Sequence, residues 1–172
     1  AGLTDTAAVV CLANVDWQSL RTLSGGGDGI VRLWDLGKGS LILELKQHTG
    51  SVCALSANWS SRHALSAAAD GVLWLWDIEF GTPLRGLRGH TDAIRCMQVD
   101  WDKKSVVSAG FDRSVRVWDL DSGSVVRQFI CHADVVTCLA VDWHSRRVVS
   151  GGGDGTLHLQ EIKPRGRCEQ QM

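Results

Sequence analysis

The chain has 172 residues, a formal net charge of −1 and an apolar fraction of 44%, which suit one packed domain. The near-zero charge argues against a general nucleic-acid binder and against attachment to an anionic membrane surface. No apolar run approaches the roughly 20 residues that a membrane-spanning helix needs. We therefore expect neither nucleic acid nor a membrane as a partner.

Short strands with tight turns are predicted along the chain, most clearly over residues 93–130. Four strand-like segments follow one another there, at 94–99, 106–108, 114–118 and 125–129. Frequent β-branched residues, with Gly or Asp every few positions, disfavour helix throughout. Four antiparallel strands in about 40 residues describe one blade of a β-propeller.

The same pattern recurs with a constant period. Trp-Asp pairs stand 42 residues apart, and one further step reaches the degraded pair Gln160-Glu161; the intact pairs are Trp34-Asp35, Trp76-Asp77 and Trp118-Asp119. A Ser-x-x-x-Asp turn and a histidine keep the same spacing. A constant period of this size is typical of a repeat architecture. We expect repeats at approximately 6–47, 48–89, 90–131 and 132–163, which form one domain over 1–163, and a polar C-terminal tail at 164–172.

These motifs resemble those of the WD-repeat β-propeller family. The resemblance rests on the Gly-His step (intact in Gly89-His90), the Ser-x-x-x-Asp turn and the Trp-Asp end, over about 160 of the 172 residues. It implies an all-β fold, a β-propeller segment of four WD-repeat blades with four antiparallel strands each. The last blade is expected to be incomplete, because the residues after Ile162 are polar and unlike a fourth strand.

In this family the His, Ser, Asp and Trp of one repeat form a hydrogen-bonded network inside the blade. The resemblance implies two full sets: His48, Ser66, Asp70, Trp76 and His90, Ser108, Asp112, Trp118. A partial set, His132, Ser150 and Asp154, has Gln160 in the tryptophan position, and the first repeat has Thr6 in the histidine position. Because the loss of one buried partner costs about 1–3 kcal/mol, both terminal repeats are expected to be weakened.

The recurrence of Ser, His and Asp argues against a hydrolase triad. An enzyme needs one triad in one pocket, whereas structural use explains every copy. The Gly-rich turns at 25–27 and 151–153 lack the Lys and helix of a P-loop and the ligands of an EF-hand. We expect no catalytic activity, no cofactor and no metal site.

Cysteine usage indicates a reducing environment. No two of the six cysteines form a C-x-x-C pair, so zinc and thioredoxin-like sites lack their spacing. Four cysteines lie in apolar runs, where this residue is most simply a small buried side chain: Cys11, Cys53, Cys96 and Cys138. An intracellular protein, cytoplasmic or nuclear, is expected rather than a disulfide scaffold.

Four tryptophans of the same period lie in polar turns: Trp17, Trp59, Trp101 and Trp143. They form an exposed aromatic ladder, or each packs its indole on a neighbouring blade, which we favour. The number of blades leaves another choice open, because family propellers most often close from seven blades, which needs about 300 residues. The chain is a piece of a longer protein, or two or more copies complete a ring, or four blades close alone.

By the same resemblance, partners bind on the rim of the central channel, next to the Val or Ile of each first strand and just before each turn Asp. The candidate binding residues are Arg95, Phe111, Cys53, Cys11 and Thr137. Arg95 and Phe111 stand out, because Arg and aromatic residues are common interface hot spots, and the pair suits an acidic or carboxylate-bearing segment. The sequence predicts a non-catalytic scaffold for protein or peptide partners; the alternative is a regulatory WD-repeat segment of a larger multidomain protein.

Overall fold

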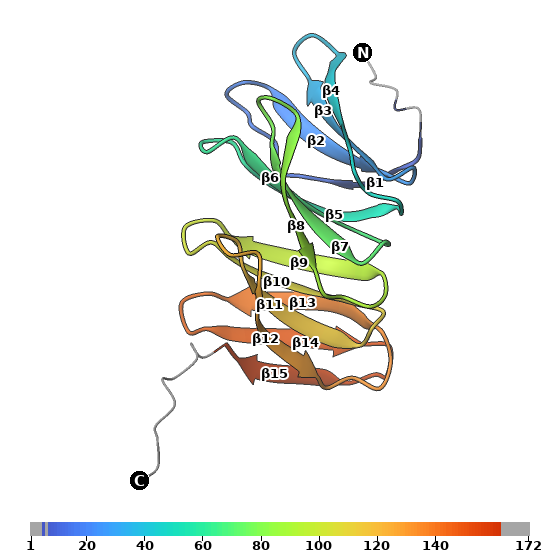
Figure 1. Cartoon of the computed structure of the whole chain (residues 1–172), viewed down its shortest axis with the longest axis vertical. Helices are drawn as coiled ribbons and strands as arrows, with labels where there is room; N and C mark the ends of the chain where they lie inside the picture. Colours follow the sequence, from blue (N-terminus) through green and yellow to red (C-terminus); the bar gives the residue numbers. More distant parts are fainter. Residues whose placement is uncertain (1–4, 6, 163–172) are drawn as a thin grey trace.

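The computed structural model describes residue 5 and residues 7–162, and every regular element in this range is a β-strand (Figure 1). The strands form four antiparallel sheets in chain order. The first contains β1 (Val9–Leu12), β2 (Arg21–Gly26), β3 (Ile30–Asp35) and β4 (Ser40–Lys46), and the second β5 (Val52–Asn58), β6 (His63–Ala68), β7 (Val72–Asp77) and β8 (Thr82–Arg88). The third contains β9 (Ile94–Asp100), β10 (Ser105–Gly110), β11 (Ser114–Asp119) and β12 (Val125–Ile130), and the fourth β13 (Val136–Asp142), β14 (Arg147–Gly152) and β15 (Leu157–Glu161).

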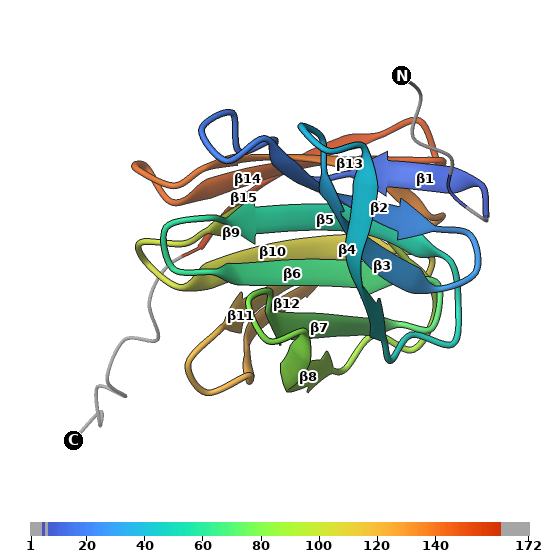
Figure 2. The ribbon, with the colours of Figure 1, turned by 90° about the horizontal axis from the view of Figure 1, so that it is seen from above.

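Each sheet is one blade, and the four blades follow one another from the N-terminal to the C-terminal end of the molecule (Figure 1). The first strands β1, β5, β9 and β13 lie on one side, and β8 and β12 lie toward the other (Figure 2). The all-β propeller segment is confirmed, and the fourth blade has three strands within the described residues. The predictions for Thr6 and for the tail 164–172 fall outside those residues, and no helix within them reaches the length and hydropathy of a membrane span.

The Ser-x-x-x-Asp motif forms the turn between the second and third strands of each blade. The aspartate side chain accepts a hydrogen bond from the backbone N–H two residues later, as in Asp70 with Val72 (3.0 Å) and Asp112 with Ser114 (3.1 Å). The residue between them has a left-handed backbone, which glycine adopts at little cost: φ is 75° at Gly71 and 62° at Arg113. The repeated sequence therefore specifies the same turn in each blade.

The core lies between the blades, in three apolar clusters. Val52 packs against the first blade, Ile94 against the second and Val136 against the third, and all three are fully buried. Trp59 and Trp101 also lie against the preceding blade, where their Nε1 atoms donate to the Asn14 carbonyl (2.9 Å) and the Ser56 hydroxyl (3.1 Å). Burial of this apolar surface between blades is the main stabilising term of the fold.

Candidate functional site

A buried polar network crosses the second blade. The Nδ1 atom of His48 lies 2.9 Å from an Asp70 carboxylate oxygen, and its Nε2 atom lies 2.8 Å from the Ser66 hydroxyl. The indole N–H of Trp76 donates to the same hydroxyl at 2.8 Å. These contacts fit a neutral imidazole that donates from Nδ1 to the carboxylate and accepts at Nε2 from the serine.

The third blade repeats this geometry. His90 lies 2.8 Å from Asp112 and 2.7 Å from the Ser108 hydroxyl, and Trp118 donates to Ser108 at 2.8 Å. Burial lowers the pKa of His48 and of His90, and the neighbouring aspartates only partly offset it. Both imidazoles are therefore neutral at pH 7.

These networks have the residue types of a hydrolase triad but not its accessibility. Ser66 and Ser108 are fully buried, and each hydroxyl accepts a hydrogen bond from a tryptophan N–H. A nucleophilic serine must reach a substrate carbonyl, which these side chains cannot do. Within the described residues, no three His, Cys, Asp or Glu side chains converge on a metal position. The network is suited to holding a blade together.

The terminal blades depart from this network in different ways. In the fourth blade, His132 contacts Ser150 (2.9 Å) and Asp154 (3.2 Å), while the Gln160 amide donates to the Cys131 sulfur instead. The Gln160 carbonyl oxygen is buried and is the only such side-chain atom without a hydrogen-bond partner in the described residues.

The first blade replaces the histidine with an ion-pair cluster. Buried Arg32 bridges Asp5 (3.1 Å), Asp28 (2.7 Å) and Glu44 (3.1 Å), and the Ser24 hydroxyl donates to Asp5. Trp34 donates to Ser24 (2.8 Å), as the equivalent tryptophans do in the second and third blades. The repeat pattern did not predict this cluster, although an arginine flanked by three acids was a usable signal.

The rim of each inner strand carries a β-bulge. The pairing of each first strand with its neighbour skips one residue, and the skipped residues are Val10, Cys53, Arg95 and Thr137. Bulges redirect side chains and are frequent at functional sites. Three of the five predicted binding residues therefore occupy matching positions: Cys53, Arg95 and Thr137.

The prediction for Cys11 needs a correction, because this residue does not occupy the bulge position. It pairs with Gly25 as Cys96 pairs with Ala109, so it lies one residue beyond the bulge and is partly buried toward the second blade. The reason is that the first blade has one more residue than the other blades between Leu12 and Asp16. A count by the constant period cannot detect this extra residue. Burial raises the pKa of the Cys11 thiol to about 12. The residue at the bulge of the first blade is Val10.

The second set of predicted rim positions lies just before each turn Asp. Their backbone N–H groups donate to the residue before the first strand at 2.8–2.9 Å, as in Gly27 to Ala8, Ala69 to Ser51, Phe111 to Ala93 and Gly153 to Val135. Phe111 is the one large residue at these four positions, since the other three are glycine or alanine, and its side chain is 51% exposed. Because Ala93 is two residues from Arg95, the structure brings Phe111 and the exposed Arg95 to one part of the rim.

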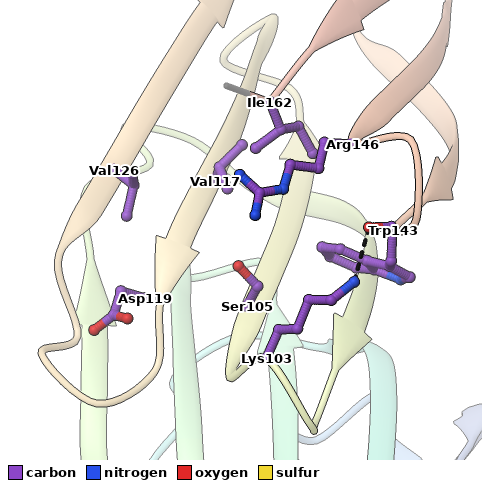
Figure 3. A pocket seen from close by; sticks show the side chains of 8 residues that line it. All are labelled: Lys103, Ser105, Val117, Asp119, Val126, Trp143, Arg146 and Ile162. Carbon is purple, nitrogen blue, oxygen red and sulfur yellow. Dashed lines mark hydrogen bonds between the residues drawn. The ribbon is translucent and has the colours of Figure 1, made fainter. Parts of the chain in front are cut away.

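A groove between consecutive blades was not predicted. Between the third and fourth blades it has a volume of about 460 Å³ and is lined by apolar residues together with Lys103, Asp119 and Arg146 (Figure 3). The Lys103 ammonium donates to the Trp143 carbonyl at 2.8 Å. The residues equivalent to Arg146 in the other two grooves form ion pairs with acids: Arg62 pairs with Glu79, and Lys104 pairs with Asp121. One period after Glu79 and Asp121 the sequence has Lys163, a residue that the structure does not describe.

Comparison with known proteins decides the family. The family model "WD domain, G-beta repeat" matches residues 4–35, 39–77, 81–119 and 123–159. The chain belongs to the WD-repeat family. Each matched range ends at or beside a Trp-Asp position, and the WD-repeat chain thus has four repeats of similar length.

One curated WD-repeat relative is Eukaryotic translation initiation factor 3 subunit I from Bombyx mori, 46% identical over 41 residues. This match covers 24% of the chain and 12% of that protein, which is about one repeat. Among solved structures, the computationally designed protein Ika4 is 31% identical with a TM-score of 0.82, over 93% of this chain and 94% of Ika4. The designed protein Ika8 is 32% identical with a TM-score of 0.81, over 92% of this chain and 47% of Ika8.

Proposed function

We propose that the chain is a non-catalytic interaction scaffold that binds protein or peptide partners at its rim. The observation that carries this proposal is that exposed Phe111 and exposed Arg95 lie on one part of a rim where the other turn residues are small. Aromatic and arginine side chains are typical of residues that dominate binding energy. The family to which the chain belongs generally presents surfaces rather than catalysing reactions.

The chemistry of the rim indicates the kind of partner. Phe111 offers an apolar face, and the Arg95 guanidinium offers donors in a planar fork that suits a carboxylate. The occupant is an extended segment with an aliphatic or aromatic side chain beside Asp, Glu or a terminal carboxylate. Cys53 and Thr137 flank Arg95 on the neighbouring blades at the same bulge position and complete the surface.

An experiment with matched aromatics tests the site. Peptides are selected from a random library on the purified chain, and their affinities are measured by isothermal titration calorimetry. Phe111→Ala and Arg95→Ala are each expected to weaken binding about tenfold or more. Phe80→Ala is the control, since Phe80 is 74% exposed but lies in the β7–β8 turn, at the opposite end of the blade. Equal affinities for all three variants would exclude this rim site.

The alternative role is a regulatory WD-repeat segment within a larger multidomain protein or assembly. The similarity to a protein named as a translation initiation factor subunit supports a place in a multi-protein complex. An intracellular location, cytoplasmic or nuclear, belongs to the same proposal and is supported by the five free thiols within the described residues. Sequence on either side of this chain in its gene separates the scaffold from the regulatory segment.

A further inference from the structure

The N-terminal end of the row of blades exposes residues that are buried elsewhere. Val9 pairs with Gly26 as Val52 pairs with Ala68 and Ile94 with Gly110, so these three residues occupy equivalent positions. Val52 and Ile94 are fully buried against the preceding blade, whereas Val9 is 49% exposed. Leu12 and Trp17 are also exposed, although their equivalents Leu55, Met97, Trp59 and Trp101 pack on the preceding blade. We call Val9, Leu12 and Trp17 the N-terminal face.

The C-terminal end exposes the opposite half of the same interface. Leu157 pairs with Gly151 as Val31 pairs with Gly25 and Val115 with Ala109. Val31 and Val115 are fully buried, whereas Leu157 is 76% exposed. Leu159 and Val149 are exposed in the same way, while their equivalents Val117 and Val107 are buried. We call Val149, Gly151, Leu157 and Leu159 the C-terminal face.

The internal junctions show how two such faces fit together. A Cβ atom added to Gly25 would lie 2.7 Å from a Val52 methyl group, so the valine fills the space above a small residue. Leu23 and Val31 flank that space in the same apolar cluster. In the fourth blade, Gly151 is the small residue and Val149 and Leu157 are its flanks. The N-terminal face has the matching valine, Val9.

We propose that the N-terminal face of one copy docks on the C-terminal face of a second copy, and that two copies close a ring of eight blades. In a two-fold symmetric pair each chain gives one face and receives the other at two equivalent junctions, so no apolar end stays exposed. The inference goes beyond partner binding at the rim and does not depend on it. The similarity to Ika8 supports it, because an equally good superposition uses only 47% of that chain, which is therefore about twice as long.

One hydrogen-bonding position distinguishes the proposed junction from the internal ones. Asn14 accepts from the Ala57 N–H (3.1 Å), and Gln98 accepts from the Val141 N–H and donates to the Leu139 carbonyl (both 3.2 Å). The equivalent residue in the fourth blade is the exposed Ala140. A glutamine at position 140 would restore these contacts across the junction between copies.

Light scattering after size exclusion tests the ring. The chain is expected at twice its mass of 18.7 kDa, which is 37.4 kDa. Val9→Asp and Leu157→Asp are each expected to give particles of 18.7 kDa, because a carboxylate would be buried without a partner. Phe80→Asp, at a position as exposed as Leu157 and away from both faces, should remain at 37.4 kDa. A single species of 18.7 kDa in the unchanged chain overturns the proposal, and a series of larger multiples overturns closure by two copies.

A second variant gives the opposite direction of effect. Ala140→Gln replaces an exposed residue, and it is expected to lower the dimer dissociation constant about tenfold or more in sedimentation experiments over a dilution series. Ala140→Glu is the matched control, since it has the same length but cannot donate to a carbonyl. Equal dissociation constants for the unchanged chain and Ala140→Gln would contradict the proposed junction. Peptide binding that persists in a Val9→Asp monomer would leave the rim site intact, so the two proposals fail separately.

Discussion

The third and fourth blades contain the same His-Ser-Asp network, but their tryptophan positions differ. His90 and His132 contact their serine and aspartate partners with similar geometry. Trp118 is fully buried against the second blade, whereas Gln160 leaves a buried carbonyl oxygen without a partner. The His-Ser-Asp contacts are thus preserved in both of these blades. The tryptophan position is where the two blades differ, both in its apolar packing and in its hydrogen bond to the serine, and this comparison predicts that the two blades differ in stability.

The largest effect is expected from removal of the third-blade indole. Trp118→Ala should lower the free energy of unfolding by about 3–5 kcal/mol, because it empties a fully buried site and leaves Ser108 without its donor. Gln160→Ala at the equivalent position should cost about 1 kcal/mol or less. Urea unfolding followed by circular dichroism measures both. Equal losses would show that the blades do not differ in this way.

A serine pair sharpens the comparison. Ser108 makes hydrogen bonds with both His90 and Trp118, whereas Ser150 makes one only with His132 among the network residues. Ser108→Ala should therefore cost about 2–4 kcal/mol and Ser150→Ala about 1–2 kcal/mol. Thermal unfolding gives the ranking, and a larger loss in Ser150→Ala would contradict it.

Two of the buried histidines, His48 and His90, predict a pH dependence of stability. An unfolded histidine has a pKa near 6.5, and burial lowers the pKa of His48 and His90 in the folded chain. The unfolded state then binds more protons between the two values, so stability is full above about pH 6.5 and falls as the pH drops toward the folded pKa. The urea midpoint should be lower at about pH 5.5 than at about pH 7.5. A flat profile across this interval would show that both imidazoles keep their usual pKa.

The smallest expected effect is an increase in stability. Gln160→Leu removes the carbonyl oxygen that is buried without a partner and should raise the free energy of unfolding by about 0.5–1 kcal/mol. The matched change Gln98→Leu should instead destabilise, because Gln98 makes two bonds to the fourth blade. Denaturant titration of the two variants gives the signs, and a loss in Gln160→Leu would contradict the account.

The period of 42 residues was enough to predict the blades and the turn motif, because both depend on local residue order. It could not place Cys11, since one extra residue in the first blade shifts the strand by one register position. Nor could it show that Trp17 is exposed while Trp59 packs, because the same residue type behaves differently where no blade of the described residues lies against it. The Arg32 cluster and the grooves between blades depend on contacts that differ from one repeat to the next.

The hydrogen bonds that anchor the rim turns have a consequence for how such surfaces change. At Gly27, Ala69, Phe111 and Gly153 the structural bond comes from the main chain, so the side chain is not needed to hold the turn. Side chains at positions 27, 69 and 111 can therefore vary with little loss of folding, whereas a side chain at Gly153 must first displace the Asp134 carboxylate. A lineage that keeps the turn and varies these side chains would change the proposed binding surface one blade at a time.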